Sequence, residues 1–329
     1  MTQFKALVAT EADGVVSTQV TQLSLDQLPP HDVLVKVNYS TINYKDALAV
    51  TGKSKICRSF PMVCGIDLAG EVLESATSDW KEGDAVLVNG FGLSESHWGG
   101  YSQYQRLKSE WLVKMPDSFT ARDCMAIGTA GYTAMLCVMA VEEGGITPKD
   151  GPVLVTGASG GVGSFAITLL HRLGYSVTAA TGSSGEHEWL KSIGANQIID
   201  RNELARDSKP MEKEVWSAAI DSVGGKTLAT VLAQTRYNGV VAACGLAGGF
   251  TLPSTVMPFI LRNVRLQGVD SVQAPLSRRV AAWQRLSELL NADDLKPLYE
   301  LATLEQVPEL AQQLLQGQLS KRRVVEIAT

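Results

Sequence analysis

The sequence predicts an α/β protein with a β-rich N-terminal domain followed by a doubly wound, nucleotide-binding domain. Three observations indicate this fold class. Up to about Asp123, short stretches of alternating apolar and polar residues are separated by turn residues, which is typical of half-buried strands. After residue 150, apolar strand-like segments alternate with helical ones, the pattern of a parallel sheet covered on both faces. That alternation opens with residues 152–163, an apolar strand that ends in a glycine-rich turn.

The change of period sets the expected domain boundaries. In the β-rich part, residues 33–39 alternate clearly, and residues 65–72 and 83–88 each begin with a turn glycine. Around Asp123 the apolar spacing becomes that of a helix. We therefore expect a β-rich catalytic domain over residues 1–123 and a nucleotide-binding domain over residues 124–271, with residues 272–329 packing back on the first domain.

The later elements follow the same reasoning. Strand candidates lie at residues 197–199, 218–221, 240–244, 264–269 and 323–327, and helix candidates at residues 186–191, 257–261 and 278–290. Two domains of this kind leave a cleft between them, where we expect the ligands to bind.

The turn after the first strand of the nucleotide-binding domain has the residues that a dinucleotide requires. Gly160 and Gly163 fill the second and third places of the pattern G-x-G-x-x-G, while Ala158 replaces the first glycine. Glycines let the backbone approach the pyrophosphate, and the N-terminus of the next helix attracts its negative charge. The alternative is a glycine-rich turn with a purely structural role.

The next strand candidate, residues 175–180, favours NADP(H) over NAD(H). It ends in Thr181, Gly182, Ser183 and Ser184, without the acidic residue that would bind the ribose hydroxyls of NAD. Small hydroxyl groups and backbone N–H groups can receive a 2′-phosphate instead. The alternative is that the two serines only cap the following helix.

The composition excludes several classes of function. The net charge is −5 and no basic stripe is present, so we expect neither a nucleic-acid partner nor a membrane surface. The five cysteines are scattered and outside any C-x-x-C pair, as in a protein of a reducing compartment. We see no apolar signal core or membrane span, and therefore expect a cytoplasmic protein.

Five motifs follow one another along the chain: residues 43–49, residues 89–92 with 97–100, residues 128–131, residues 156–163 and residues 243–250. In this order they resemble the medium-chain dehydrogenase/reductase superfamily. More narrowly, the chain is similar to the acrylyl-CoA reductase (NADPH) branch of its zinc-free quinone oxidoreductase group, the YhdH/AcuI type. The resemblance implies a chaperonin-10-like β domain and a Rossmann domain.

The same alignment by motif argues against a metal. Alcohol dehydrogenases of the superfamily hold zinc through a Cys near the first motif and a His in a Gly-His-Glu turn. Here Asn43 stands at the first place and Gly65, Ile66 and Asp67 at the second, and the four-cysteine structural loop is absent. Reducing a ketone commonly needs such a Lewis acid, whereas an activated C=C bond needs only donors that stabilise an enolate.

The resemblance also implies catalytic candidates. Tyr44 is expected beside the nicotinamide, where its phenol orients the ring or protonates the α-carbon; the alternative is a tyrosine packed at the domain interface. Asn43 either belongs to the catalytic set or holds its loop through side chain to backbone bonds. Asp67 either tunes a proton donor or has a structural role.

The expected cofactor is NADPH. By resemblance, its pyrophosphate lies at Ser159, Gly160, Gly161 and Val162, and its 2′-phosphate at Thr181, Gly182 and Ser183. Relatives are expected to carry Arg at the place of Ser183, and Arg201 either supplies the missing cation or is an ordinary surface arginine. Leu246, Ile260 and Ser271 are expected on the nicotinamide side, although Leu246 and Ile260 could be plain core.

The leading hypothesis is an NADPH-dependent reductase of α,β-unsaturated acyl-CoA, acryloyl-CoA to propanoyl-CoA above all. The alternatives are a zinc-independent NADPH quinone reductase and a protein that binds NADPH without turnover. The strand candidate at residues 264–269, near a sheet edge, suggests a homodimer. The sequence identifies neither the exact acyl-CoA, nor the proton donor, nor the residues that bind the nucleotide part of CoA.

Overall fold

The computed structural model describes residues 2–319 and 321–327. Contacts divide the chain into two compact units: a first unit, Met1–Thr129 with Ser271–Thr329, and a second unit, Ala130–Asp270. The first boundary falls inside the helix α2 (Ala121–Glu143), which the sequence reasoning assigned to the second domain.

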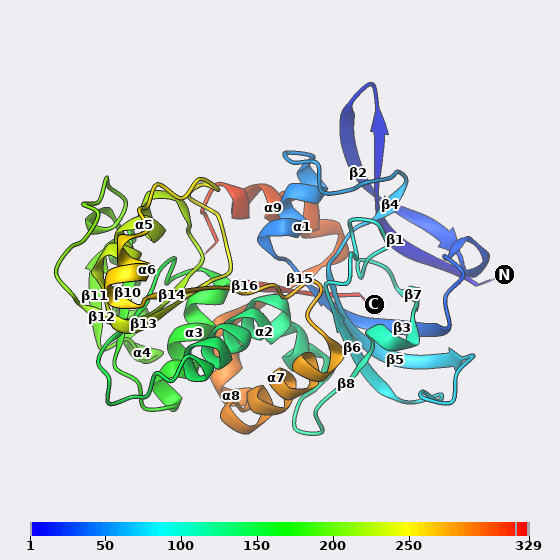
Figure 1. Ribbon diagram of the computed structural model, residues 1–329. Helices are drawn as coiled ribbons and strands as arrows, with labels where there is room; N and C mark the ends of the chain where they lie inside the picture. The colour runs from blue at the N-terminus through cyan, green and yellow to red at the C-terminus, as the bar shows by residue number, and fades with distance from the viewer. Residues whose placement is uncertain (1, 320, 328–329) are drawn as a thin grey trace. The chain divides into compact units, whose positions relative to one another are not determined.

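The first unit is mainly β, as the sequence predicts. A three-stranded sheet has the order β2-β1-β4, and a seven-stranded sheet has the order β15-β16-β3-β5-β6-β8, with β7 also paired to β3 (Figure 1). The strands are β1 (Gln3–Ala12), β2 (Val15–Ser24), β3 (Val33–Thr41), β4 (Met62–Val63), β5 (Asp67–Ser75), β6 (Ala85–Asn89), β7 (Tyr104–Leu107), β8 (Val113–Lys114), β15 (Tyr299–Thr303) and β16 (Arg322–Glu326).

The first unit also contains a helix that the sequence reasoning took for a loop. Helix α1 (Tyr44–Thr51) begins at the N-cap residue Asn43 and ends at Gly52, which adopts the left-handed conformation. The backbone N–H of Asn43 donates to Asp46 Oδ2 at 2.8 Å, so a capping box starts the helix. Asn43, which the sequence reasoning considered as a loop-stabilising residue, instead favours a helix N-terminus together with Asp46.

The remaining helices of this unit come late in the chain. Helix α9 (Val307–Leu315) packs against α1, and the two lie side by side in Figure 1. Helix α7 (Leu276–Leu289) presents Arg279 and Trp283 to the interior, where both are buried. The short helix α8 (Ala292–Leu295) follows it.

The second unit is a Rossmann domain. Its six strands are all parallel in the order β11-β10-β9-β12-β13-β14, so the chain order reverses between β9 and β12. Open α/β sheets bind ligands beyond the carboxyl ends of the strands at such a switch point. The strands are β9 (Val153–Val155), β10 (Val177–Thr181), β11 (Gln197–Asp200), β12 (Trp216–Asp221), β13 (Thr235–Ala243) and β14 (Arg265–Gly268).

Helices of the second unit join and cover these strands. Helix α3 (Gly161–Arg172) packs against β9 and β10, and α5 (Gly225–Gln234) against β12 and β13. The strand residues Leu154, Ala219 and Val241 form a buried core with side chains of α5. Helices α4 (His187–Ser192) and α6 (Met257–Arg262) are short.

Helix α2 is broken near its middle. Gly128 has φ 51° and ψ −161°, so two helical pieces meet at a kink, where the sequence pattern predicted one continuous helix. By length and composition α2 could cross a membrane, but 89% of its apolar window is buried inside the structure.

Candidate functional site

The first unit contains a buried carboxylate with four hydrogen-bond donors. Asp67, at the start of β5, has no exposed surface. Its Oδ2 accepts from Asn43 Nδ2 and from the Thr129 N–H, both at 2.8 Å. Its Oδ1 accepts from Asn89 Nδ2 at 2.7 Å and from Thr129 Oγ1 at 2.5 Å. A buried charge is tolerated only with such partners. We call Asp67, Asn43, Asn89 and Thr129 the Asp67 network.

The kink in α2 provides two of these four donors. Because the backbone at Gly128 leaves the helical conformation, the N–H of Thr129 points to Asp67 rather than along the helix. A Cβ at residue 128 would lie 2.7 Å from Arg322 Nη2 and 3.0 Å from Asp67 Oδ2, at a positive φ. Only glycine fits there. The sequence reasoning missed this role, although an isolated glycine within a helical pattern pointed to it.

A second buried carboxylate lies beside the first. The Asp46 carboxylate accepts three hydrogen bonds: from the backbone N–H of Asn43 at 2.8 Å, from Asn43 Nδ2 at 3.0 Å, and from the Ile66 N–H at 2.8 Å. The Asn43 amide therefore donates to both Asp46 and Asp67. Burial, followed by the nearby charge of Asp67, raises the pKa of Asp46 to about 7, against the effect of its N–H donors.

A buried arginine completes the cluster. Arg322, at the start of β16, donates from Nη2 to Thr41 Oγ1 at 2.9 Å and to Asn43 Oδ1 at 3.3 Å, and from Nε to the Ala126 carbonyl at 2.8 Å. Burial lowers its pKa, while the charges of Asp67 and Asp46 act in the opposite direction. The sequence reasoning missed Arg322 because nothing local distinguishes it from a strand-end arginine.

Of the three catalytic candidates, the structure brings two into contact. Asn43 and Asp67 share a hydrogen bond. Tyr44 is the first residue of α1 and is 51% exposed, outside the hydrogen bonds of the Asp67 network. Its neighbour Lys45 pairs with Glu95 at 2.8 Å.

The residues at the motif positions of the alcohol dehydrogenase zinc do not fit a metal ion. Asn43 uses its amide on two carboxylates and Arg322, and Ile66 is a buried apolar residue. Within the described part of the chain, no group of three or more His, Cys, Asp or Glu residues could hold a metal. Zinc binding at these positions would need a cysteine or histidine ligand, whereas Asn43 and the nearby Arg322 present amide and guanidinium groups.

The second unit contains the tight turn predicted to receive a pyrophosphate. Gly157, two residues after the end of β9, adopts φ 58° and makes the sharp turn that the G-x-G-x-x-G pattern places at position 158. Gly160 is the N-cap of α3. A Cβ at residue 163 would lie 2.3 Å from the Gly157 carbonyl oxygen, so Gly163 lets the helix approach the strand. Ser159, Gly161 and Val162 lie in this turn and on the first residues of α3.

The end of β10 brings together the residues expected at the 2′-phosphate. The Thr181 hydroxyl lies 3.4 Å from that of Ser159 and accepts from the Ser183 N–H at 3.2 Å. Ser183 is the N-cap of the one-turn helix Ser184–Glu186. A Cβ at residue 182 would lie 2.5 Å from Arg201 Nε, so the Arg201 side chain rests against Gly182.

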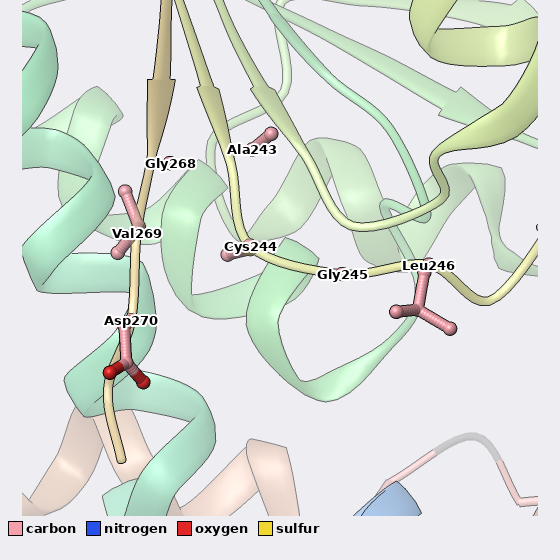
Figure 2. A pocket seen from close by; sticks show the side chains of 7 residues that line it. All are labelled: Ala243, Cys244, Gly245, Leu246, Gly268, Val269 and Asp270. Carbon is pink, nitrogen blue, oxygen red and sulfur yellow. The ribbon is translucent and has the colours of Figure 1, made fainter. Parts of the chain in front are cut away.

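A pocket of about 480 Å³ opens beyond the carboxyl ends of β13 and β14. Figure 2 shows Cys244 to Leu246 following one strand and Val269 with Asp270 following the other. Leu246 is 64% exposed and Ile260, on α6, is 71% exposed, so neither is plain core. Ser271 belongs to the first unit, where its carbonyl accepts from Arg279 Nη2 at 3.1 Å.

The raised pKa of Asp46 predicts a pH dependence. The pKa of Asp46 is about 7 in the folded state and 3.8 in the unfolded state. The contribution of Asp46 to stability is therefore complete below pH 3.8 and lost as the pH rises through 7.

The variant Asp67→Asn removes the neighbouring charge and should lower the titration midpoint of Asp46. This midpoint is measured by ¹³C NMR of the Asp46 carboxyl group. Glu71→Gln, on an exposed residue of the same strand, should leave it unchanged. A wild-type midpoint near 4 would contradict this assignment.

Two family models match the chain. The alcohol dehydrogenase GroES-like domain covers residues 29–117, and the zinc-binding dehydrogenase domain covers residues 161–291. The "Probable acrylyl-CoA reductase AcuI" of Escherichia coli is 53% identical, over 98% of this chain and 99% of that protein. The acrylyl-CoA reductase AcuI of Ruegeria pomeroyi is 47% identical, over the same shares.

Solved structures agree in fold along the whole chain. The YhdH oxidoreductase from Salmonella enterica, in complex with NADP, has a TM-score of 0.96 and 53% identity, over 98% of this chain and 99% of that one. The Bacillus subtilis protein YhfP, solved with NAD bound, has a TM-score of 0.96 and 41% identity, over 99% and 100%. The chain therefore belongs to the medium-chain dehydrogenase/reductase superfamily, in the branch of the acrylyl-CoA reductases.

Proposed function

We propose that the chain reduces the C=C bond of an α,β-unsaturated acyl-CoA with NADPH, with acryloyl-CoA to propanoyl-CoA as the leading reaction. The observation that carries the proposal is the Asp67 network together with Arg322. At positions 43 and 65–67, where zinc-dependent relatives need metal ligands, Asn43 and Asp67 are already engaged in hydrogen bonds with each other and with Asn89, Thr129 and Arg322. Such a site suits an activated C=C bond better than a simple ketone. The near full-length similarity to the AcuI proteins supports the acyl-CoA as substrate.

When bound, NADPH supplies a hydride for the β-carbon of the thioester. Negative charge would then accumulate on the thioester oxygen, where hydrogen-bond donors lower its energy, while a proton reaches the α-carbon. Tyr44 has an accessible phenol that can orient the reactants or give that proton. Asn43 caps α1 immediately before Tyr44 and is itself held by Asp67, so the network fixes the helix end that carries the phenol.

For the cofactor, we propose that its pyrophosphate lies at the N-terminus of α3, against Ser159, Gly160, Gly161 and Val162. The contact between Arg201 and Gly182 supports Arg201 as the cation for the 2′-phosphate, together with Thr181 and Ser183. The exposed side chains of Leu246 and Ile260 support a place on the nicotinamide side, and Ser271 is proposed there by resemblance.

We further propose a cytoplasmic, zinc-independent enzyme. All five cysteines lie among the described residues and are free thiols, as expected in a reducing compartment.

A homodimer is proposed from the edge of the Rossmann sheet. Strand β14 is the last in the sheet order, and three of its four residues are exposed. Pairing two copies of β14 would satisfy backbone groups at the edge of each sheet.

The reaction itself gives the first test. With acryloyl-CoA, the purified protein should oxidise NADPH rapidly and NADH more slowly. Treatment with EDTA should leave the rate with NADPH unchanged. Tyr44→Phe should lower kcat by about 10²-fold if the phenol supplies the proton. Turnover with small quinones but none with the thioester would support the quinone reductase instead, and NADPH binding without turnover of either would support a non-catalytic protein.

The role of Arg201 predicts a change in cofactor preference. Arg201→Ala should lower kcat/KM for NADPH by roughly 10- to 100-fold, the loss of one charge-assisted hydrogen bond, and leave kcat/KM for NADH nearly unchanged. Arg206→Ala is the matched control, because Arg206 is occupied by a surface pair with Glu212 at 2.6 Å. Equal losses with both cofactors would argue against a contact with the 2′-phosphate.

If two copies pair through β14, substitutions in this edge strand should weaken the dimer, whereas substitutions in the opposite edge strand should not. Gln267→Lys, at an exposed position of β14, should place like charges across the interface and raise the dissociation constant about tenfold or more. Gln197→Lys makes the same change at an exposed position of β11, the opposite edge strand, and should have no effect. Light scattering coupled to size exclusion measures both, and a wild-type mass of one chain would exclude the dimer.

A further inference from the structure

Helix α7 contacts the side-chain amide of Asn89, a member of the Asp67 network, through Trp283. The indole Nε1 of Trp283 donates to Asn89 Oδ1 at 3.1 Å, and the other end of the same amide donates from Nδ2 to Asp67 Oδ1 at 2.7 Å. Trp283 is 1% exposed and Asn89 is 2% exposed, so water cannot easily replace either bond. Three buried groups therefore form a chain from α7 to the carboxylate.

The direction of this chain of hydrogen bonds is set at its two ends, by the indole N–H of Trp283 and by the carboxylate of Asp67. An asparagine amide has one accepting end and one donating end, and an indole N–H can only donate. With the indole bonded to Oδ1, the NH₂ group of Asn89 must face Asp67. In the reverse orientation, Oδ1 would meet the carboxylate and Nδ2 would meet the indole N–H, which leaves two repulsive contacts in a buried, low-dielectric place.

The backbone of Asn89 is held from the same helix. Arg279 lies four residues before Trp283 and is 1% exposed. Its Nη1 donates to the Asn89 carbonyl at 2.5 Å, and its Nη2 donates to the Val272 carbonyl at 2.6 Å. Its guanidinium lies 3.7 Å from the centre of the Phe91 ring. With the backbone fixed in this way, the orientation of the Asn89 amide becomes the remaining freedom, and it is set by Trp283 on one side and by the Asp67 carboxylate on the other.

We propose that Trp283 is a positioning residue for the reaction: it orients the Asn89 amide so that its NH₂ group donates to Asp67. Asp67 in turn holds Asn43, the cap of the helix that begins at Tyr44. The effect on turnover rests on the proposed function, whereas the effect on the Asn89 amide does not.

Trp283→Phe tests this because it keeps an aromatic ring in the core and removes the N–H. In the wild type, the side-chain amide protons of Asn89 should exchange slowly in ¹H–¹⁵N spectra. In the variant, their exchange should become at least about tenfold faster, the equivalent of one lost hydrogen bond. We also expect kcat to fall about tenfold with the KM for NADPH unchanged, and the pH profile of kcat to shift.

Trp216→Phe is the matched control. Trp216 is also buried, and its Nε1 donates to a side-chain amide oxygen, Gln234 Oε1, at 3.1 Å in the second unit. This variant loses the same atom and the same kind of bond. It should leave the Asn89 exchange, kcat and its pH profile as in the wild type.

A double variant separates positioning from packing. In an Asn89→Ala background, Trp283→Phe should lower kcat no further, because its effect passes through the amide that is gone. The proposal would be overturned if the side-chain amide protons of Asn89 exchange at the wild-type rate in the folded Trp283→Phe protein. It would also be overturned if the kcat losses of the two single variants multiply in the double variant. If the wild type fails to turn over acryloyl-CoA, the proposed function fails, while the exchange measurement still decides whether Trp283 orients Asn89.

Discussion

The structure of the first unit depends on the burial of the Asp67 charge. A carboxylate without solvent is stable only when donors surround it, and the four donors of Asp67 come from Asn43, Asn89 and Thr129, which are far apart in the chain. Each of them shapes the element in which it lies. Asn43 caps α1, Asn89 ends β6, and Thr129 follows the break in α2. One buried charge thus sets the positions of three elements.

The same constraint explains the chemistry we propose. Arg322 offsets part of the negative charge of Asp46 and Asp67, and its contact with Asn43 fixes the amide that donates to both carboxylates. At the positions where zinc-dependent relatives bind their metal, this chain has Asn43 and Asp67. The oxygen atoms of Asp67 already accept hydrogen bonds from N–H and O–H donors. The reaction we propose would therefore rely on hydrogen bonds and the Tyr44 phenol instead of a metal ion, which suits an activated C=C bond.

Much of the nucleotide-binding unit could be predicted from the sequence, because its determinants are local. The apolar strand at Val153–Val155, the turn to Gly163 and the following helix are read from adjacent residues, and the parallel sheet follows from the alternation of elements. The Asp67 network could be predicted only in part. Asn43 and Asp67 were candidates, but Arg322, Asn89 and Trp283 join the cluster only in the folded chain. Gly128 is a local signal for a break in the helix, but the donor that this break turns toward Asp67 is known only from the folded chain.

The central claim is that hydride reaches the β-carbon of an unsaturated acyl-CoA. The most direct measurement is the position of the label after turnover with [4-²H]NADPH and acryloyl-CoA, read by NMR and mass spectrometry of the product. We expect deuterium at C3 of the propanoyl group from the transferring face of the cofactor, and a solvent proton at C2. Deuterium at C2, or a product without label from either face, would contradict it.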